Sequence, residues 1–232
     1  MFSRPPPATQ ALLIANVVIF VLQLLMGDAT FYPFMLWPPS EMGFDPFSPG
    51  QNFQVWQLLT YGFLHGGFGH ILFNMLALYM FGAPLEATWG AKRFTTYYLV
   101  CVAGAGLCQL AVGWWTVSQG GAAYPTIGAS GGVFGLLLAY AMLFPNHRVM
   151  LLFPPIPMKA RTFVIVIGAI SLLMGLTGGW GPGGEANVAH FAHLGGMLFG
   201  WLVIRYWRGQ PPFGRRRPPG GGGRPSHLRR VK

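Results

Sequence analysis

The chain has 232 residues, of which 53% are hydrophobic and only 9% are charged. Soluble domains carry about 25% charged residues, so this composition excludes a water-soluble globule: too little charge is available to cover its surface. At roughly 20 residues per membrane-spanning helix, the length allows six or seven spans with short loops. We therefore expect one polytopic membrane domain.

Apolar segments bounded by glycine and proline predict six transmembrane helices. In chain order they are 9–26, 66–83, 94–115, 127–144, 160–177 and 188–207. The first lacks a small-residue cleavage site after it, which indicates a retained helix rather than a signal peptide. Pro84 and Gly90 are expected to close the second. The expected fold class is all-α, a six-helix membrane bundle formed by residues 1–208.

The charges predict the orientation of this bundle. If the amino terminus is cytoplasmic, all 15 Lys and Arg residues fall on cytoplasmic segments, as the positive-inside rule requires. They are Arg4, Lys92, Arg93, Arg148, Lys159, Arg161 and the cations from Arg205 onward. The outer connections carry acidic residues instead: Asp28, Glu41, Asp45 and Glu185. If the number of helices were wrong by one, basic and acidic residues would be mixed on the same side of the membrane. Both termini are therefore expected in the cytoplasm.

Two segments lie outside the expected spans. The outer stretch 27–64 is rich in aromatic residues, which suits either partial immersion at the lipid headgroups or a folded cap on the helices. The tail 209–232 is rich in Arg, Pro and Gly and cannot form a core, so we expect disorder. Its charge favours contact with anionic membrane lipid, and nothing beyond that charge indicates nucleic-acid binding.

Polar and ionisable residues inside membrane spans are costly and by default indicate function. The second span contains His70 and Asn74, the fourth begins near Ser130, and the sixth contains His193. All three helices begin on the outer side in the expected orientation. At 1.5 Å per residue, Ser130 and His193 both lie at a depth of roughly 10 Å. We therefore expect three distant segments to meet in one layer.

These residue types fit nucleophilic catalysis. A serine hydroxyl needs a base, and histidine is the usual base near neutral pH. Ser130 and His193 are the candidate pair, and no Asp or Glu lies at this depth, which favours a dyad over a triad. An oxyanion needs preorganised donors. The candidates are the Ser130 N–H, the Asn74 amide and the His70 ring, because residues four apart share a helix face.

Small residues predict how the fourth and sixth helices approach each other. Gly131 with Gly135, and Gly196 with Gly200, are two small-xxx-small pairs, which allow close backbone contact. If the two helices pack through these pairs, Ser130 and His193 face each other one turn outward.

Other readings of the histidines and cysteines are less specific. A lone membrane histidine can serve packing alone, and His65 and His190 are taken as structural. A metal site is chemically possible, but it lacks an H-E-x-x-H pattern and a carboxylate base; its ligands would be His65, His70, His190 and His193. Cys101 and Cys108 lie seven apart in one apolar run, which indicates buried, reduced packing residues rather than a disulfide.

Three stretches together resemble the signatures of rhomboid proteases, in matching order and helix placement. They are H-G-G-F-G-H-I-L-F-N (65–74), G-A-S-G (128–131) and A-H-L-G-G-M-L-F-G (192–200). The resemblance covers about residues 9–207. It implies that Ser130 is the nucleophile and His193 the general base. It also implies an oxyanion hole of His70, Asn74 and the Ser130 amide, with Gly128 as the glycine of G-x-S-G.

The same resemblance implies the substrate, namely the transmembrane helix of another protein, cut near its outer end, with no metal or cofactor. The fifth helix and the loop 178–187 would act as gate and cap. Glu86, Gly90 and Arg93 would form a structural turn. Two positions depart from the family: the first-loop Trp-Arg pair reads Trp56-Gln57, and the aromatic residue after the serine is Phe134 rather than the frequent tyrosine.

Two other functions remain open at this stage. A non-proteolytic relative could bind membrane clients on the same scaffold, although such proteins commonly lack the serine or the histidine. A transporter or channel could line a polar path with the histidines, although no inverted half-repeats are visible. The short termini and the absence of a transit peptide favour a bacterial plasma membrane. The substrate sequence and the oligomeric state stay undetermined.

Overall fold

A computed structural model describes residues 4–39, 52–150, 156–177 and 187–209. The described chain is mostly helical, which confirms the expected class. The long helices are α1 (Pro7–Met26), α3 (Phe68–Ala77), α4 (Ala83–Trp89), α5 (Ala91–Ser118), α6 (Ser130–Leu143), α7 (Ala160–Thr177) and α8 (Asn187–Trp207). The shorter ones are η1 (Asp28–Phe34), α2 (Gln57–Thr60), η2 (Tyr61–Phe63) and the π-helical η3 (Leu78–Gly82), which joins α3 to α4.

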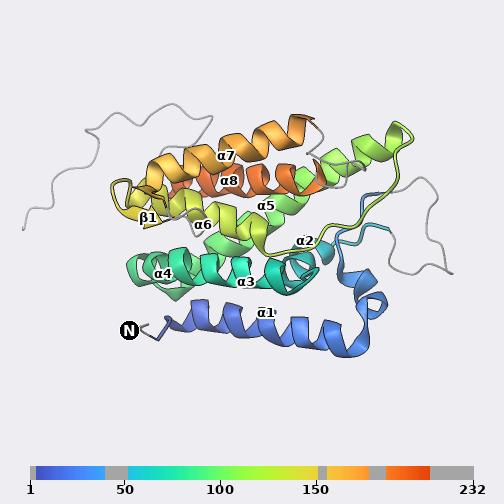
Figure 1. Cartoon of the computed structure of the whole chain (residues 1–232), viewed down its shortest axis with the longest axis horizontal. Helices are drawn as coiled ribbons and strands as arrows, with labels where there is room; N and C mark the ends of the chain where they lie inside the picture. The colour runs from blue at the N-terminus through green and yellow to red at the C-terminus, as the bar shows by residue number, and fades with distance from the viewer. Residues whose placement is uncertain (1–3, 40–51, 151–155, 178–186, 210–232) are drawn as a thin grey trace, which may run out of the picture.

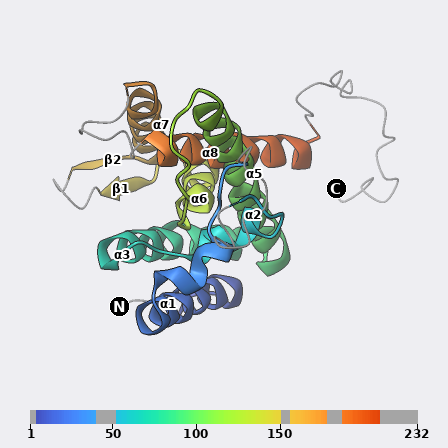
Figure 2. The same cartoon turned by 90° about the vertical axis from the view of Figure 1, so that its right-hand side faces the viewer.

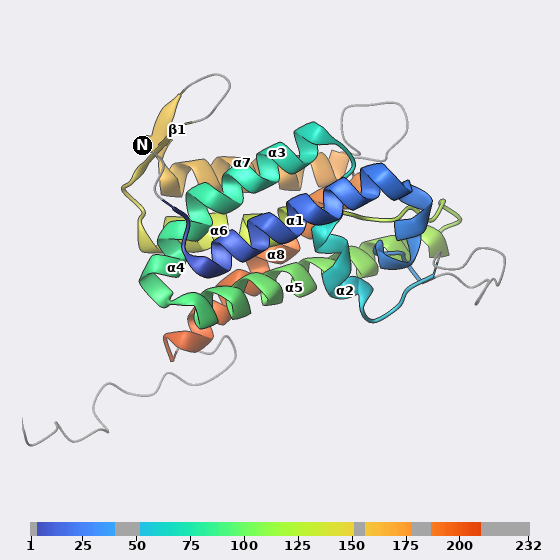
Figure 3. The same ribbon diagram turned by 90° about the horizontal axis from the view of Figure 1, so that it is seen from below.

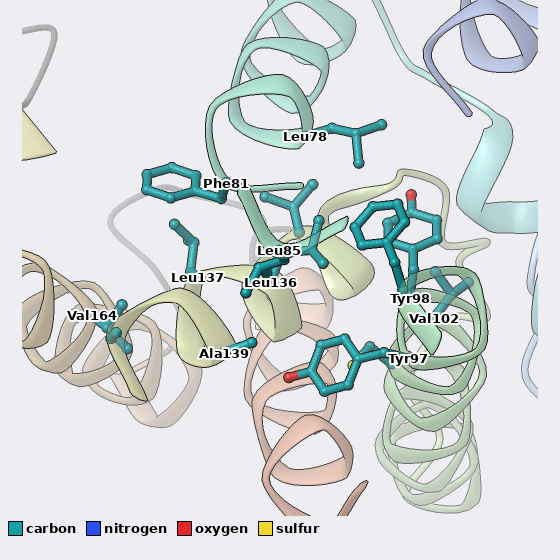
Figure 4. Close-up of a cluster of buried hydrophobic side chains, with 14 of the residues drawn as sticks. Leu78, Phe81, Leu85, Tyr97, Tyr98, Val102, Leu136, Leu137, Ala139 and Val164 are labelled. Atoms are coloured by element: carbon teal, nitrogen blue, oxygen red, sulfur yellow. The ribbon is translucent and has the colours of Figure 1, made fainter. Parts of the chain in front are cut away.

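The long helices run roughly side by side, and α6 occupies the centre of the bundle (Figures 1 and 2). It packs against α3, α4, α5, α7 and α8, whereas α1 lies on the outside against α3, η3 and α5. Figure 4 shows the core around α6, where Leu136 and Leu137 meet side chains from η3, α4 and α5. A central α6 places the residue at its amino terminus, Ser130, inside the bundle.

Four segments are long and apolar enough to cross a membrane: α1, the continuous α3–α4 segment, α5 and α7. The fourth expected span, 127–144, is shorter than expected, because α6 begins only at Ser130 and has 14 residues. Thr126 pairs with Leu36 in an isolated β-bridge, so the backbone before Ser130 is extended rather than helical. Ser130 thus lies at the first helical position.

The second span also differs from expectation, because it continues through Pro84 to Trp89. Pro84 occupies the first turn of α4, where its missing N–H costs little. Gly90, with φ of +79°, does end the helix. Glu86 is buried there, and its carboxylate accepts hydrogen bonds from the Ala8 N–H at 2.9 Å and the Thr9 N–H at 2.7 Å. This residue therefore ties the start of α1 to α4, as the expected structural role implies.

A short antiparallel hairpin, which was not expected, lies between α6 and α7. It pairs β1 (Arg148–Met150) with β2 (Pro157–Lys159), with Val149 opposite Met158. The hairpin and the amino terminus lie at one end of the bundle, and η1 and α2 lie at the other (Figures 1 and 3). The hairpin, which carries Arg148 and Lys159, thus shares one end with the amino-terminal segment that carries Arg4.

The described parts of the first loop are packed on the helices. Leu36, Tyr61 and Leu64 are buried, while Trp56 and Leu59 are exposed. The buried residues fit a folded cap and the exposed apolar ones fit contact with lipid, so both readings of 27–64 stay predictions. Two other expectations lie outside the described residues. They are the expected gating loop 178–187, except for its last residue, and the basic tail beyond residue 209.

The cysteines are unpaired, as expected. Cys101 is buried in the core beside Gly135, whereas Cys108 is only partly buried. The prediction of a buried packing residue is therefore confirmed for Cys101 and too strong for Cys108.

Candidate active site

The segment before α6 fixes where Ser130 lies. The Gly128 N–H donates to the Tyr61 carbonyl oxygen at 2.9 Å, which ties this segment to η2. Gly128 has φ of +127°, and a Cβ there would lie only 2.7 Å from His70 Nε2. Only glycine fits this conformation and this space. Ser130 then begins the helix, where backbone N–H groups have no intrahelical partner, so its amide can donate to a bound group.

Ser130 and His193 are in direct contact. Ser130 Oγ and His193 Nε2 lie 2.8 Å apart, although the residues are 63 positions apart in the chain. Close packing of α6 on α8 permits this contact, since a Cβ on Gly196 would overlap the Gly131 carbonyl oxygen. Of the four glycines expected at this contact, only Gly196 has its nearest neighbour across it. A Cβ on Gly131, Gly135 or Gly200 would first meet α5, at Ala105, Cys101 and Tyr97 respectively, although that on Gly135 would also lie 3.1 Å from the Gly196 carbonyl oxygen.

Aromatic packing holds the His193 ring. The Phe134 ring stacks on it, with centroids 4.0 Å apart and planes 7° from parallel. The His190 ring meets it edge-on at 5.9 Å. His193 Nδ1 is buried and makes no hydrogen bond within the described residues. The orientation of this ring therefore depends on stacking and on the contact of its Nε2 with Ser130.

His70 lies on the other side of Ser130. Its Nδ1 accepts a hydrogen bond from the Gly66 N–H at 3.3 Å, and its Nε2 faces the Gly128 backbone. A neutral imidazole that accepts at one nitrogen carries its proton on the other. His70 therefore carries its proton on Nε2, the nitrogen that faces Gly128, two residues before Ser130.

Asn74 is buried one turn further along α3. Its Nδ2 donates to the His70 carbonyl oxygen at 2.9 Å. One amide hydrogen is thus used within the helix and the second remains for a bound group.

His65 and His190, the two histidines expected to be structural, each contact a site histidine. The His65 ring packs edge-on against His70 at 5.0 Å and is buried. Desolvation by burial, with His70 next to it, lowers the pKa of His65 to about 4, so this ring is uncharged at neutral pH. His190 contacts His193 as described above. Both are consistent with packing roles close to the site.

Gln57, the residue that replaces the family's arginine, is the anchor of the first loop. It is fully buried. Its Oε1 accepts from the Trp37 and Gln54 N–H groups, both at 3.2 Å, and its Nε2 donates to the Pro33 and Asn52 carbonyl oxygens at 3.2 and 3.3 Å. The Gln57 amide thus accepts two hydrogen bonds and donates two, so a neutral side chain fills the position where the family commonly has a charged one.

Sequence reasoning missed Gln23 of α1, which is 3% exposed. Its side chain bonds to the main chain of His65, just before the site. A signal was present: Thr9, Asn16 and Gln23 recur every seven residues in a span whose one other polar side chain is the exposed Gln10, and all three are buried. A seven-residue polar period marks one helix face, here the face turned to the protein.

Comparison with known proteins gives a consistent picture. A family model described as the Rhomboid domain matches residues 52–209. The chain is 28% identical over 210 residues to the putative rhomboid protease YdcA of Bacillus subtilis, covering 88% of this chain and 94% of that protein. It is 24% identical over 209 residues to the rhomboid protease GlpG of Yersinia pseudotuberculosis, covering 88% of this chain and 64% of GlpG.

A mitochondrial relative, rhomboid protein 1 of Saccharomyces cerevisiae, is 31% identical over 152 residues, which is 62% of this chain and 40% of the yeast protein. The chain thus spans less than two thirds of both GlpG and the yeast protein. The family model nevertheless covers more than half of the chain, from the first loop to the end of α8. The protein therefore belongs to the rhomboid family.

Proposed function

We propose that this protein is an intramembrane serine endopeptidase that cleaves transmembrane helices of other membrane proteins near their outer end. Ser130 is the nucleophile and His193 the general base. The observation that carries the proposal is the 2.8 Å contact between Ser130 Oγ and His193 Nε2. Family membership supports the same activity, since relatives such as GlpG of Yersinia pseudotuberculosis are described as rhomboid proteases.

The proposed reaction has two halves. Ser130 Oγ attacks the scissile carbonyl carbon while its proton passes to His193 Nε2, and the resulting oxyanion accepts hydrogen bonds from the Ser130 N–H and His70 Nε2–H. Asn74 supplies a further donor. The C–N bond then breaks as His193 protonates the leaving amine, which leaves an acyl ester on Ser130. A water molecule, deprotonated by His193, hydrolyses this ester and restores the serine.

The proposed topology is six spans with both termini in the cytoplasm, in a bacterial plasma membrane and in contact with its lipid. Four of the spans meet the length and hydropathy expected of a membrane helix, and α6 and α8 complete the six. The clustering of cations at one end of the bundle supports the orientation. Reporter fusions at each terminus, tested for cytoplasmic exposure, check it.

The protease proposal is tested by cleavage of a transmembrane-helix substrate in proteoliposomes. Ser130→Ala and His193→Ala are expected to abolish cleavage while the protein still inserts and folds. Ser171→Ala is the matched control, because Ser171 is also a buried serine in a membrane helix, on α7, and it should cleave normally. Equal cleavage by Ser130→Ala contradicts the proposal. If the wild-type protein binds the substrate helix but yields no cleavage product, the result would favour the non-proteolytic alternative.

A further inference from the structure

The backbone between η2 and α3 needs partners outside itself. His65 and Gly66 belong to neither helix, and both of their N–H groups and the His65 carbonyl oxygen bond to side chains instead. The side chain of Gln23, on α1, makes hydrogen bonds to both main-chain groups of His65. The His65 N–H donates to Gln23 Oε1 at 3.0 Å, and Gln23 Nε2 donates to the His65 carbonyl oxygen at 3.4 Å. One buried amide therefore holds both main-chain groups of a single residue.

The His65 carbonyl and the Gly66 N–H belong to the same peptide unit. In a trans peptide the C=O and N–H point in opposite directions within one plane. With the carbonyl directed to Gln23, the Gly66 N–H is directed to the other side, where it donates to His70 Nδ1 at 3.3 Å. The hydrogen bonds thus form a continuous path from α1 through one peptide to the His70 ring.

The orientation of this peptide determines which nitrogen of His70 carries the proton. As it stands, Nδ1 accepts, so Nε2 is protonated and can donate. If the peptide flipped, the His65 carbonyl would face Nδ1 and select the opposite tautomer, with Nε2 as an acceptor. Such a flip changes ψ of His65 and φ of Gly66, and glycine adopts positive and negative φ at similar cost. An external hold is therefore needed.

We infer that Gln23 is a positioning residue for the reaction: it holds the His65–Gly66 peptide so that His70 presents an Nε2–H donor towards Ser130. The inference rests on the proposed function for its catalytic consequence. Its structural part, the tautomer of His70, is independent of activity. The His65 ring, edge-on to His70 at 5.0 Å, fills the space next to the ring and supports the same placement.

The test is the side-chain ¹⁵N NMR spectrum of histidine-labelled protein in detergent micelles, with turnover measured on the same samples. In the wild type, His70 Nδ1 should be unprotonated and Nε2 protonated. Gln23→Met removes both bonds to His65 and should produce a mixed or reversed tautomer. Because a lost oxyanion donor acts on the chemical step, kcat should fall about 10- to 100-fold with little change in KM.

Asn16→Leu is the matched control. Asn16 is another buried amide on α1, but its Nδ2 bonds only within its own helix, to the Leu12 carbonyl oxygen at 2.7 Å. This variant should keep the tautomer and kcat.

A wild-type His70 protonated at Nδ1 would overturn the inference even if no variant folds. So would a folded Gln23→Met protein that melts at a lower temperature but keeps the wild-type tautomer, because that result describes a purely structural residue. Failure of the protease proposal is recognised separately, as wild-type protein that never cleaves whatever its tautomer.

Discussion

Replacing Phe134 by leucine removes the stack that holds the proposed base while keeping an apolar side chain of similar size. The two rings lie 4.0 Å apart and 7° from parallel. Such aromatic pairs contribute about 0.5–1.5 kcal/mol beyond the burial of their surface. In the transition state His193 becomes cationic, which strengthens its attraction to the ring face. At about 1.4 kcal/mol per tenfold in rate, kcat should fall roughly 2- to 10-fold.

The assay is steady-state cleavage of a transmembrane substrate in proteoliposomes, with kcat and KM determined separately. Phe144→Leu is the matched control, because Phe144 stacks on His147 at 4.9 Å and 18° at the other end of α6, away from Ser130. It should leave kcat unchanged, and Phe134→Tyr should retain activity because it keeps the ring. An unchanged kcat in Phe134→Leu, or an equal loss in both leucine variants, would refute the role given to the stack.

Three further predictions concern stability, measured by thermal unfolding in detergent. Gly196→Ala should destabilise the protein by about 1–3 kcal/mol or more, because its Cβ would overlap the backbone of α6. Gly69→Ala is the control: its Cβ meets no atom within 4 Å, so it should be neutral or stabilising. Equal effects of the two changes would contradict the close contact between α6 and α8. Gln57→Leu removes four hydrogen bonds to the backbone and should cost about 2–4 kcal/mol. A smaller loss than that of an exposed Gln→Leu change would contradict the anchoring role of Gln57. Glu86→Leu should cost a similar amount, about 2–4 kcal/mol, because it removes the carboxylate that accepts hydrogen bonds from the start of α1. An unchanged melting temperature would contradict this structural role of Glu86.

Much of the fold follows from composition and patterning. Runs of apolar residues between glycines and prolines place the helices to within a few residues, because lipid leaves a backbone few alternatives to the helix. The proposed site residues were also found from sequence, because a polar side chain in an apolar span is conspicuous. The structure brings Ser130, His193 and His70 together from three helices.

The features that could not be predicted from the sequence are those decided by tertiary contacts. Pro84 signals a helix end by itself, yet a π-helical segment before it lets the helix continue. The start of α6 at Ser130 depends on the bridge between Thr126 and Leu36, a pairing of distant residues. The role of Gln57 is likewise invisible locally, since its four partners come from a loop that only the fold assembles.

Reaction with a fluorophosphonate probe tests the central claim most directly, because the probe reacts with a serine only when that serine is activated as a nucleophile. Mass spectrometry of the labelled, folded protein should place the adduct on Ser130, and both Ser130→Ala and His193→Ala should remain unlabelled. Labelling of another serine, or undiminished labelling of Ser130 in the His193→Ala protein, would contradict the account.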